Sequence, residues 1–293
     1  DIGYKHAGPA LIVCATDSQN PTVVRIAAST ALGKIGMDAN PSNLSAQQTV
    51  VANRFYAGEN SLQPQPIGGL NLFWKWDGEN QLVALDIPEE VFFDVMAMYY
   101  ASEALGTDVD NATAMSTFVG ANLRRNRALA GRNDLVYGDL AYSPEFYATV
   151  FGPKIAQLVL TTSLQDGDTP LVLDSITALS KTAGADALLQ SGSQPIVVAM
   201  QYPDRRVQYE AALTLASTLP NSYFEGSYRV VPLLASAIRQ QGEEFAIVIG
   251  DNADVRREIR AFLQSNGWTV VGEGVTVDEA MNAAGVVAGI DLV

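Results

Sequence analysis

The chain has 293 residues, 48% of them hydrophobic, and its 18 basic and 32 acidic residues leave a net charge of −14. This charge argues against a nucleic-acid partner, because neutralising phosphates requires a basic face. A single cysteine, Cys14, and a single histidine, His6, exclude an internal disulfide framework, a thiolate metal cluster and most histidine-dependent catalysis. No apolar run reaches the roughly 18 residues that a membrane helix needs. We therefore expect no enzyme activity, no cofactor and no membrane-spanning segment in this span.

Two helices are predicted at the start of the chain. Residues 9–16 form a short apolar run, and residues 20–36 carry Pro21, which suits a first helical turn, and Gly36, which suits a helix end. Apolar side chains recur on one face of the second helix, at Val24, Ala28, Ala31, Leu32 and Ile35. The two segments are expected to form a closely packed helical hairpin.

An aromatic β-hairpin is predicted after a helix over 45–57 and a loop over 63–69. Two alternating runs within 71–88 flank a turn signal at residues 77–80. Alternation places Phe73 on one face and Trp74 and Trp76 on the other. If one face packs on helices, the other exposes a large apolar area, which is typical of an interaction site. Core packing and partner contact both stay open for these three residues.

Two further helices are predicted over 89–105 and 111–130, and the pair resembles a tetratricopeptide-type hairpin. The second helix and its end carry the main basic cluster of the chain, formed by Arg124, Arg125, Arg127 and Arg132. This cluster either grips a phosphate or an acidic partner, or pairs with carboxylates within the chain or between subunits. In a chain this acidic, pairing with carboxylates is the favoured interpretation.

Helices resume over 145–163, and two later segments repeat the pattern of the first helical hairpin. The apolar face of residues 168–185 is formed by Val172, Ile176, Leu179 and Ala183, and the turn over 166–168 is expected to cap this helix. The apolar face of residues 202–220 is formed by Val207, Ala211, Leu215 and Leu219. The apolar run over 193–201, before this helix, is similar to the run over 9–16. The two segments begin about one helical-hairpin repeat apart.

The first of these copies resembles the second helix of a HEAT repeat. The residues that carry the resemblance are Pro21, Val24, Arg25, Ala27, Ala28, Ala31, Leu32, Gly33, Ile35 and Gly36. The two later copies are looser. The resemblance covers about half of the chain and implies helical hairpins stacked into a curved solenoid, with almost no information on activity.

The last segment alternates strands and helices, which implies a parallel, doubly wound sheet. Strands are predicted over 245–249 and 268–272, helices over 253–266 and 277–284, and the beginning of a further strand over 288–293. The helix over 253–266 is expected to end at Gly267. Its inward face is expected to carry Val255, Ile259, Phe262 and Leu263. Because the chain begins at Asp1 and stops within a strand pattern at Val293, we expect the natural protein to continue.

Residues 247–274 resemble the first half of a bacterial response-regulator receiver domain. In receivers, two acidic residues after the first strand hold Mg²⁺ beside a phospho-accepting aspartate. Asp251 occupies the second acidic position, but Gly250 occupies the first, and the acceptor would fall beyond Val293. With one carboxylate of three, Asp251 is a weak metal ligand. A degenerate receiver-like unit used for packing is the favoured interpretation.

We therefore predict a mainly α-helical, HEAT-like solenoid, interrupted by the β-hairpin and closed by an incomplete receiver-like α/β unit. The expected segments are 1–43, 44–135, 136–241 and 242–293. The expected function is a non-enzymatic scaffold, a subunit of a bacterial assembly whose partners are copies of itself. The alternative is a signalling adaptor that the receiver-like unit switches. Composition favours the cell envelope or export over the cytoplasm. The candidate contact residues are Phe73, Trp74, Trp76, Arg124, Arg125 and Arg127.

Overall fold

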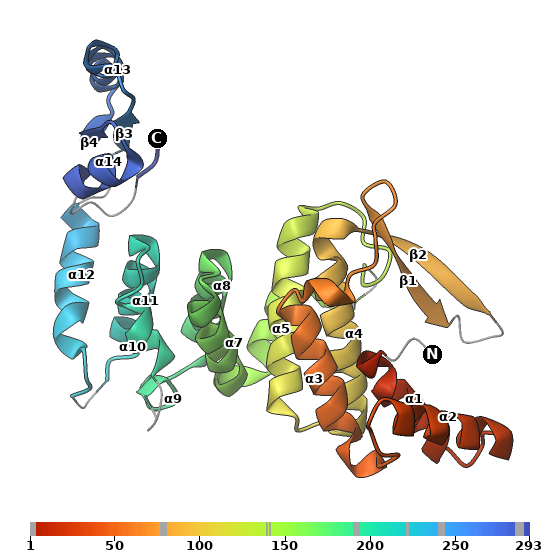
Figure 1. Ribbon diagram of the computed structural model, residues 1–293. Helices are drawn as coiled ribbons and strands as arrows, with labels where there is room; N and C mark the ends of the chain where they lie inside the picture. The colour runs from red at the N-terminus through yellow and green to blue at the C-terminus, as the bar shows by residue number, and fades with distance from the viewer. Residues whose placement is uncertain are drawn as a thin grey trace. The chain divides into compact units, whose positions relative to one another are not determined.

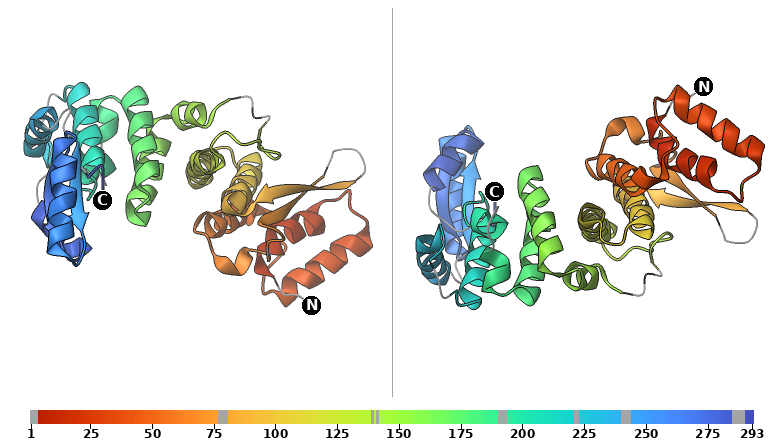
Figure 2. Two further views of the ribbon diagram at one scale, coloured as in Figure 1. Left: turned by 90° about the horizontal axis from the view of Figure 1, so that it is seen from above. Right: turned by 90° about the horizontal axis from the view of Figure 1, so that it is seen from below.

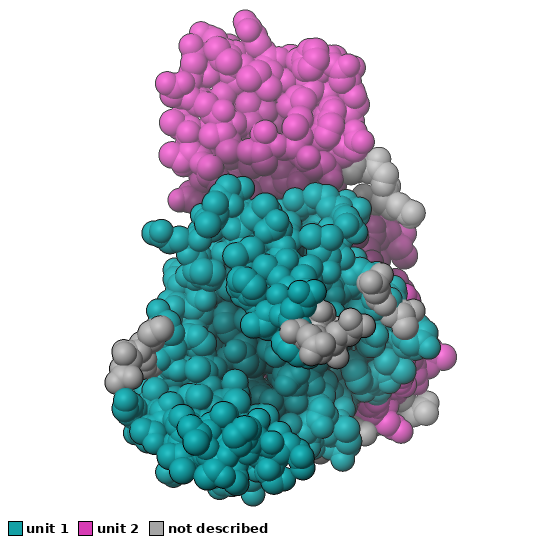
Figure 3. All heavy atoms as spheres, turned by 90° about the vertical axis from the view of Figure 1, so that its right-hand side faces the viewer, with its two compact units in different colours: residues 1–159 teal, residues 160–293 magenta. Residues whose placement is uncertain are grey.

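The computed structural model describes residues 4–76, 81–138, 140, 142–189, 194–220, 223–239, 244–284 and 290–293. The protein is mainly α-helical, with 65% helix. Its described residues form fourteen α-helices, one antiparallel hairpin and one parallel strand pair (Figures 1 and 2). The chain divides into two compact units, residues 1–159 and 160–293 (Figure 3). The predicted mainly helical class, with a hairpin and an α/β end, is confirmed, and the finer division into four segments stays a prediction.

The first unit begins with the predicted helical hairpin, formed by α1 (Gly8–Thr16) and α2 (Thr22–Lys34). Of the predicted apolar face, Ala28 and Leu32 are buried and Ala31 and Ile35 are half-buried, but the prediction is wrong for Val24, which is 42% exposed. The side-chain amide of Asn20 donates to the carbonyl of Cys14, 3.2 Å away, and so ties the connection between the two helices to α1.

Three further helices pack side by side in the same unit, as Figures 1 and 2 show: α3 (Leu44–Tyr56), α4 (Phe92–Thr107) and α5 (Ala112–Leu129). Asn111 caps α5 by accepting a 3.0 Å hydrogen bond from the amide of Ala114. The Asn111 side chain also donates to the hydroxyls of Ser45 and Thr49 on α3, both 2.9 Å away. One residue therefore begins α5 and fixes it against α3.

The β-hairpin consists of β1 (Leu70–Trp76) and β2 (Leu82–Pro88), which pair antiparallel as predicted. The predicted turn at residues 77–80 lies outside the described residues. The inner face of the hairpin carries Asn71, Phe73 and Ile87, all buried. The Phe73 ring meets that of Tyr99 on α4 edge to face, with centroids 5.6 Å apart. Of the two alternatives for Phe73, core packing and partner contact, the structure therefore shows core packing.

Asn71 is a polar residue in this apolar setting. Its side chain is 2% exposed, and neither its amide nitrogen nor its oxygen has a hydrogen-bond partner among the described residues. Because burying an unpaired amide is costly, we expect Asn71→Leu to raise the free energy of unfolding by about 1 kcal/mol. Urea unfolding of both proteins measures the change. A lower free energy in the variant would show that the amide has a partner, such as a buried water.

The first unit continues through α6 (Pro144–Val150), and α7 (Gly152–Asp166) contains the division between the units. Gly152, with a φ of +81°, separates the two helices, so the predicted helical segment over 145–163 is two helices. Short 3₁₀ helices occupy Lys5–Ala7, Pro41–Asn43, Asn60–Leu62 and Glu89–Val91.

The second unit contains α8 (Thr169–Thr182), α9 (Ala185–Leu189), α10 (Pro195–Ala199), α11 (Arg205–Ser217) and α12 (Ser227–Arg239). Helices α8, α10 and α12 all contact α11. Asp168 caps α8 as predicted, accepting from the amide of Leu171 at 3.0 Å. Six residues of the predicted apolar faces of α8 and α11 are buried: Val172, Ile176, Leu179, Val207, Ala211 and Leu215. Leu219 is instead 78% exposed, because α11 ends at Ser217 and Leu219 has a φ of +48°.

The α/β end of this unit follows the predicted order: β3 (Phe245–Ile249), α13 (Ala253–Ser265), β4 (Thr269–Gly274) and α14 (Val277–Ala284). Strands β3 and β4 pair in parallel, and a parallel bridge joins Leu292 to Ala246 of β3. Leu263 of α13 packs with Ala246 and Val248, whereas α14 packs on the other face of the sheet with Ile247.

The prediction for α13 is wrong at three of its four inward residues. Only Leu263 is buried, and the exposed fractions of Val255, Ile259 and Phe262 are 47%, 42% and 67%. Two strands and one bridge form a sheet too narrow to cover the whole apolar face of the helix within the described residues. Gly267 follows α13 as predicted, with a φ of +91°.

Candidate functional site

The outer face of the hairpin is exposed, and we define its apolar part as Leu70, Leu72, Trp74, Trp76, Leu82 and Ala84. Asp86, opposite Leu72, is exposed on the same face. Strand alternation turns these residues away from the buried inner face. Trp74 and Trp76 are 58% and 55% exposed, and Leu82 is 63% exposed. An exposed surface of this composition is typical of a contact site.

The strand register brings these apolar side chains together. Trp74 lies opposite Ala84 and Trp76 lies opposite Leu82, on the same face of the two strands. Directly opposed residues in an antiparallel pair have Cβ atoms about 5 Å apart. The two tryptophans and Leu82 therefore form one continuous apolar surface instead of isolated exposed residues.

The first arginine of the basic cluster, Arg124, is held inside the first unit. Its Nε and Nη2 atoms donate to Oδ1 of Asp94 on α4, at 2.9 and 2.6 Å, and Asp94 is 7% exposed. The same guanidinium donates to the carbonyl of Tyr56 at 2.9 Å and lies 4.1 Å from the centre of the Tyr56 ring. Arg124 therefore joins α3, α4 and α5.

Arg125 is still more deeply buried, at 4% exposed. Its Nη1 forms an ion pair with Asp134, and its Nη2 donates to Oδ1 of Asn122 at 2.7 Å. The guanidinium carbon lies 5.3 Å from the centre of the Tyr137 ring. Burial raises the pKa of Tyr137 and lowers that of Arg125, because each charged form is poorly solvated there.

The remaining arginines of the cluster lie nearer the solvent. Arg132 pairs with Glu90 at 2.5 Å, and this hydrogen bond lowers the pKa of the Glu90 carboxyl. Arg127 is exposed on α5. Arg124, Arg125 and Arg132 thus all pair with carboxylates of their own chain. Pairing within the chain was one of the two kinds of carboxylate pairing that the acidic composition favoured.

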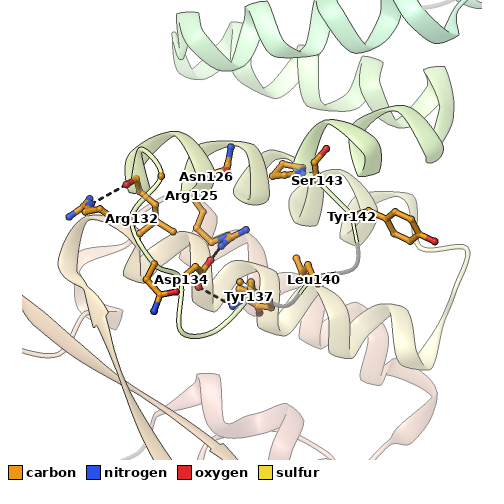
Figure 4. A pocket seen from close by; sticks show the side chains of 13 residues that line it. Arg125, Asn126, Arg132, Asp134, Tyr137, Leu140, Tyr142 and Ser143 are labelled. Carbon is orange, nitrogen blue, oxygen red and sulfur yellow. Dashed lines mark hydrogen bonds and ion pairs between the residues drawn. The ribbon is translucent and has the colours of Figure 1, made fainter.

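A pocket of about 560 Å³ lies beside Arg125, between the end of α5 and the segment that leads to α6 (Figure 4). Figure 4 shows Arg125 and Asp134 at its centre with Tyr137 next to them. Asp134 accepts from the amides of Val136 and Tyr137, both at 2.9 Å, which orders this segment. Ser143 at the rim accepts from the amide of Phe146 and so serves as the cap of α6.

Asp251 lies exposed just after β3, at the edge of the sheet where a receiver places its metal. Next to it, Arg256 donates to the carbonyl of Gly250. Glu273 of β4 pairs with Arg256 at 3.3 Å and with Arg260 at 2.9 Å. No group of three or more His, Cys, Asp or Glu residues that could hold a metal occurs among the described residues. Asp251 therefore belongs to no such group of three within this part of the chain.

Neither the pocket nor the partners of the individual arginines were predicted from the sequence. One signal was available for Arg124: Asp94 interrupts the apolar start of α4, and an acid in such a position is typical of a buried ion pair. The connector over 131–144 carries no comparable signal, because its Asp, Asn and Tyr residues also suit an ordinary loop.

Comparison of the chain with known protein families, curated proteins and solved structures finds no match. Within the described residues, no helix has the length and apolar character that crossing a membrane requires.

Proposed function

We propose that the protein is a non-enzymatic scaffold that makes protein–protein contacts through the outer face of the β-hairpin. The observation that carries this proposal is the exposure of Trp74 and Trp76 on one continuous apolar surface. Covering the exposed half of two tryptophans removes roughly 200 Å² of apolar area from water, which is worth on the order of 5 kcal/mol before the entropy cost of association.

The partner we propose is a second copy of the same chain. Trp74, Trp76, Leu82 and Ala84 carry no charge, whereas Asp86, opposite Leu72 on the same face, lies farther along the strands from Trp76; two copies can therefore meet at the tryptophans without pairing like charges despite the net charge of −14. A two-fold contact would place the same surface on both partners. The composition favours a bacterial cell-envelope assembly as the setting.

Light scattering over a dilution series tests this proposal. The unmodified protein is expected to show a mass that is a multiple of 31.3 kDa and falls on dilution. Trp74→Ser combined with Trp76→Ser is expected to give the monomer mass at every concentration, because hot-spot tryptophans dominate such contacts. Far-ultraviolet circular dichroism checks that the helices of the variant are intact.

Val109→Ser combined with Val150→Ser is the matched control. It removes two apolar side chains that are 69% and 58% exposed but lie outside the hairpin, and it is expected to keep the mass of the unmodified protein. A monomer at every concentration in the unmodified protein, or an oligomer that the tryptophan changes leave intact, would contradict self-association through this face.

We also propose that the helical hairpins are HEAT-like and that the α/β end is receiver-like. The packing of both α8 and α12 against α11 supports the first, because neighbouring repeats contact one another in such arrays. The order β4, β3 and then the bridge at Leu292 supports the second, because doubly wound sheets place their first strand inside. The arginine pairs around Gly250 and Glu273 favour packing over a phosphorylation switch.

A further inference from the structure

Helix α12 carries apolar side chains on two of its faces, although a helix on a protein surface usually has only one apolar face. The first face is formed by Val230, Leu233, Leu234 and Ala237, which are all half-buried. Helix α11 lies beside α12, as Figure 1 shows, and the hydroxyls of Tyr209 and Ser236 share a hydrogen bond of 3.2 Å between the two helices. The half-buried face therefore accounts for the packing of α12 within its unit.

The second apolar face of α12 is exposed, and we call it the outer face of α12. Its residues follow one another at intervals of three, four and three, the spacing at which two helices pack along a seam; they are Tyr228, Val231, Ala235 and Ile238. Tyr228, Val231 and Ile238 are 67%, 73% and 73% exposed, and Ala235 is half-buried. Together they expose on the order of 400 Å², which is typical of the largest apolar patch on a monomer, a patch that is often functional.

Two arginines lie against this outer face, in a helix that contains no acidic residue. Nε of Arg229 donates to the hydroxyl of Tyr228 at 3.3 Å, and its guanidinium carbon lies 5.6 Å from the centre of the Tyr228 ring. Nε of Arg239 donates to the carbonyl of Ala235 at 3.2 Å. Neither arginine forms an ion pair with a carboxylate among the described residues. The outer face of α12 therefore combines an apolar surface with two positive charges that this part of the chain does not neutralise.

The shape and the charge of this surface favour an acidic helix as its partner. The stretch from Tyr228 to Ile238 spans about 15 Å, or three helical turns, and a second helix with apolar residues at the same spacing can pack along it. Positive charge beside the apolar residues favours a partner helix that carries carboxylates next to its own apolar residues. Charges more than about 8 Å away are largely screened at physiological ionic strength. Arg229 and Arg239 therefore act on such a helix more strongly than the net charge of −14 does.

We propose that the outer face of α12 binds an acidic amphipathic helix of a partner protein, whose carboxylates pair with Arg229 and Arg239. The apolar side chains of that helix pack against Tyr228, Val231 and Ile238. This contact lies in the second unit and uses none of the hairpin residues, so it does not depend on self-association through the hairpin.

Fluorescence anisotropy with a synthetic peptide tests the proposal on the full chain. The probe is a fluorescein-labelled peptide of three heptads, with leucine at positions a and d, glutamate at e and g, and alanine elsewhere. It is expected to bind with a dissociation constant of about 100 μM or lower. A peptide with lysine in place of glutamate is expected to bind about tenfold more weakly, because it meets Arg229 and Arg239 with like charge. Equal or tighter binding of the lysine peptide, or no binding of the glutamate peptide at millimolar concentration, would overturn the proposal.

Variants of exposed residues locate the contact. Val231→Ser combined with Ile238→Ser is expected to weaken binding of the glutamate peptide by about tenfold, and Arg239→Gln by roughly threefold. Circular dichroism checks that the helices of these variants are intact. Val255→Ser combined with Ile259→Ser is the matched control, because it removes the same two side-chain types from α13, where they are 47% and 42% exposed. This control is expected to bind the peptide like the unmodified protein, and equal weakening by the two double changes would overturn the proposed location.

Two further measurements distinguish other occupants of the outer face of α12. The unmodified protein is expected to stay in the supernatant when phosphatidylglycerol vesicles are sedimented. Its mass in light scattering is expected to be the same with and without Val231→Ser and Ile238→Ser. Vesicle binding that these changes abolish would assign the face to a lipid surface, and self-association that they abolish would assign it to a second copy. Either result would overturn the proposal.

Discussion

Asp94→Ala is expected to lower the free energy of unfolding of the first unit by about 3–5 kcal/mol. Asp94 is 7% exposed, and it accepts two hydrogen bonds from Arg124, whose side chain is itself only 21% exposed. The variant leaves a largely buried guanidinium without its carboxylate, and such a charge is poorly solvated. Chemical unfolding followed by circular dichroism measures the loss.

A double change separates the cost of an orphaned charge from the value of the pair. Asp94→Leu with Arg124→Met removes both charges and keeps apolar volume, so it is expected to recover most of the stability lost in Asp94→Ala. Glu59→Ala is the exposed control: Glu59 pairs with Arg54 near the surface, and its removal is expected to change stability little. An effect of Asp94→Ala no larger than that of Glu59→Ala would contradict this account.

Gly272→Ala is expected to destabilise the α/β end of the second unit by about 3 kcal/mol or more. A Cβ at position 272 of β4 would collide with the backbone carbonyl of Ala280 in α14 and would lie 3.1 Å from Cγ2 of Ile247. Neither backbone can give way without lifting α14 off the sheet, where Ala280 and Ala284 are buried. The fluorescence of Trp268, which packs beside β3 on the other face, reports the unfolding of this sheet.

Gly250→Ala is the matched control for this prediction. Gly250 follows β3 in the same sheet, but a Cβ there meets its nearest neighbour, the Cγ atom of Arg256, at 3.8 Å, which is ordinary contact. The midpoint of unfolding is therefore expected to stay close to that of the unmodified protein. If both glycine changes lowered the midpoint equally, close packing of β4 against α14 would not be the cause. All of these proteins also carry Trp74→Phe and Trp76→Phe, so that Trp268 is their single tryptophan and the fluorescence reports on the α/β end alone.

Local patterns predicted the elements well where the chain alternates simply. The bounds of β3 and α14 match the predicted ones, and the faces of the hairpin follow the predicted alternation. Helix α12 was missed, because Pro232 lies inside it and proline commonly interrupts helices. The arrangement of its neighbours around α11 depends on packing between distant segments, which no local pattern encodes.

The candidate site could be predicted only in part, for the same reason. Sequence alternation separated Phe73 from Trp74 and Trp76, but could not tell which face would meet a helix. For the arginines, composition indicated pairing with acids, whereas the choice of Asp94 and Asp134 depends on the packing of α4, α5 and their connector. In α13 the periodicity correctly marked an apolar face, but did not indicate how little of it the narrow sheet would cover.

The position of Asn111 at the start of α5 restricts which residue that site tolerates. Its oxygen accepts from the amide of Ala114, while its nitrogen donates to the hydroxyls of Ser45 and Thr49. Aspartate would cap the helix equally well but, ionised at neutral pH, would donate to neither hydroxyl. Serine and threonine have a single hydroxyl for both tasks. Because Ser45 and Thr49 already donate their hydroxyl hydrogens to the carbonyls of Ala104 and Ser45, an aspartate at position 111 would keep the helix cap and lose the anchor of α5 to α3.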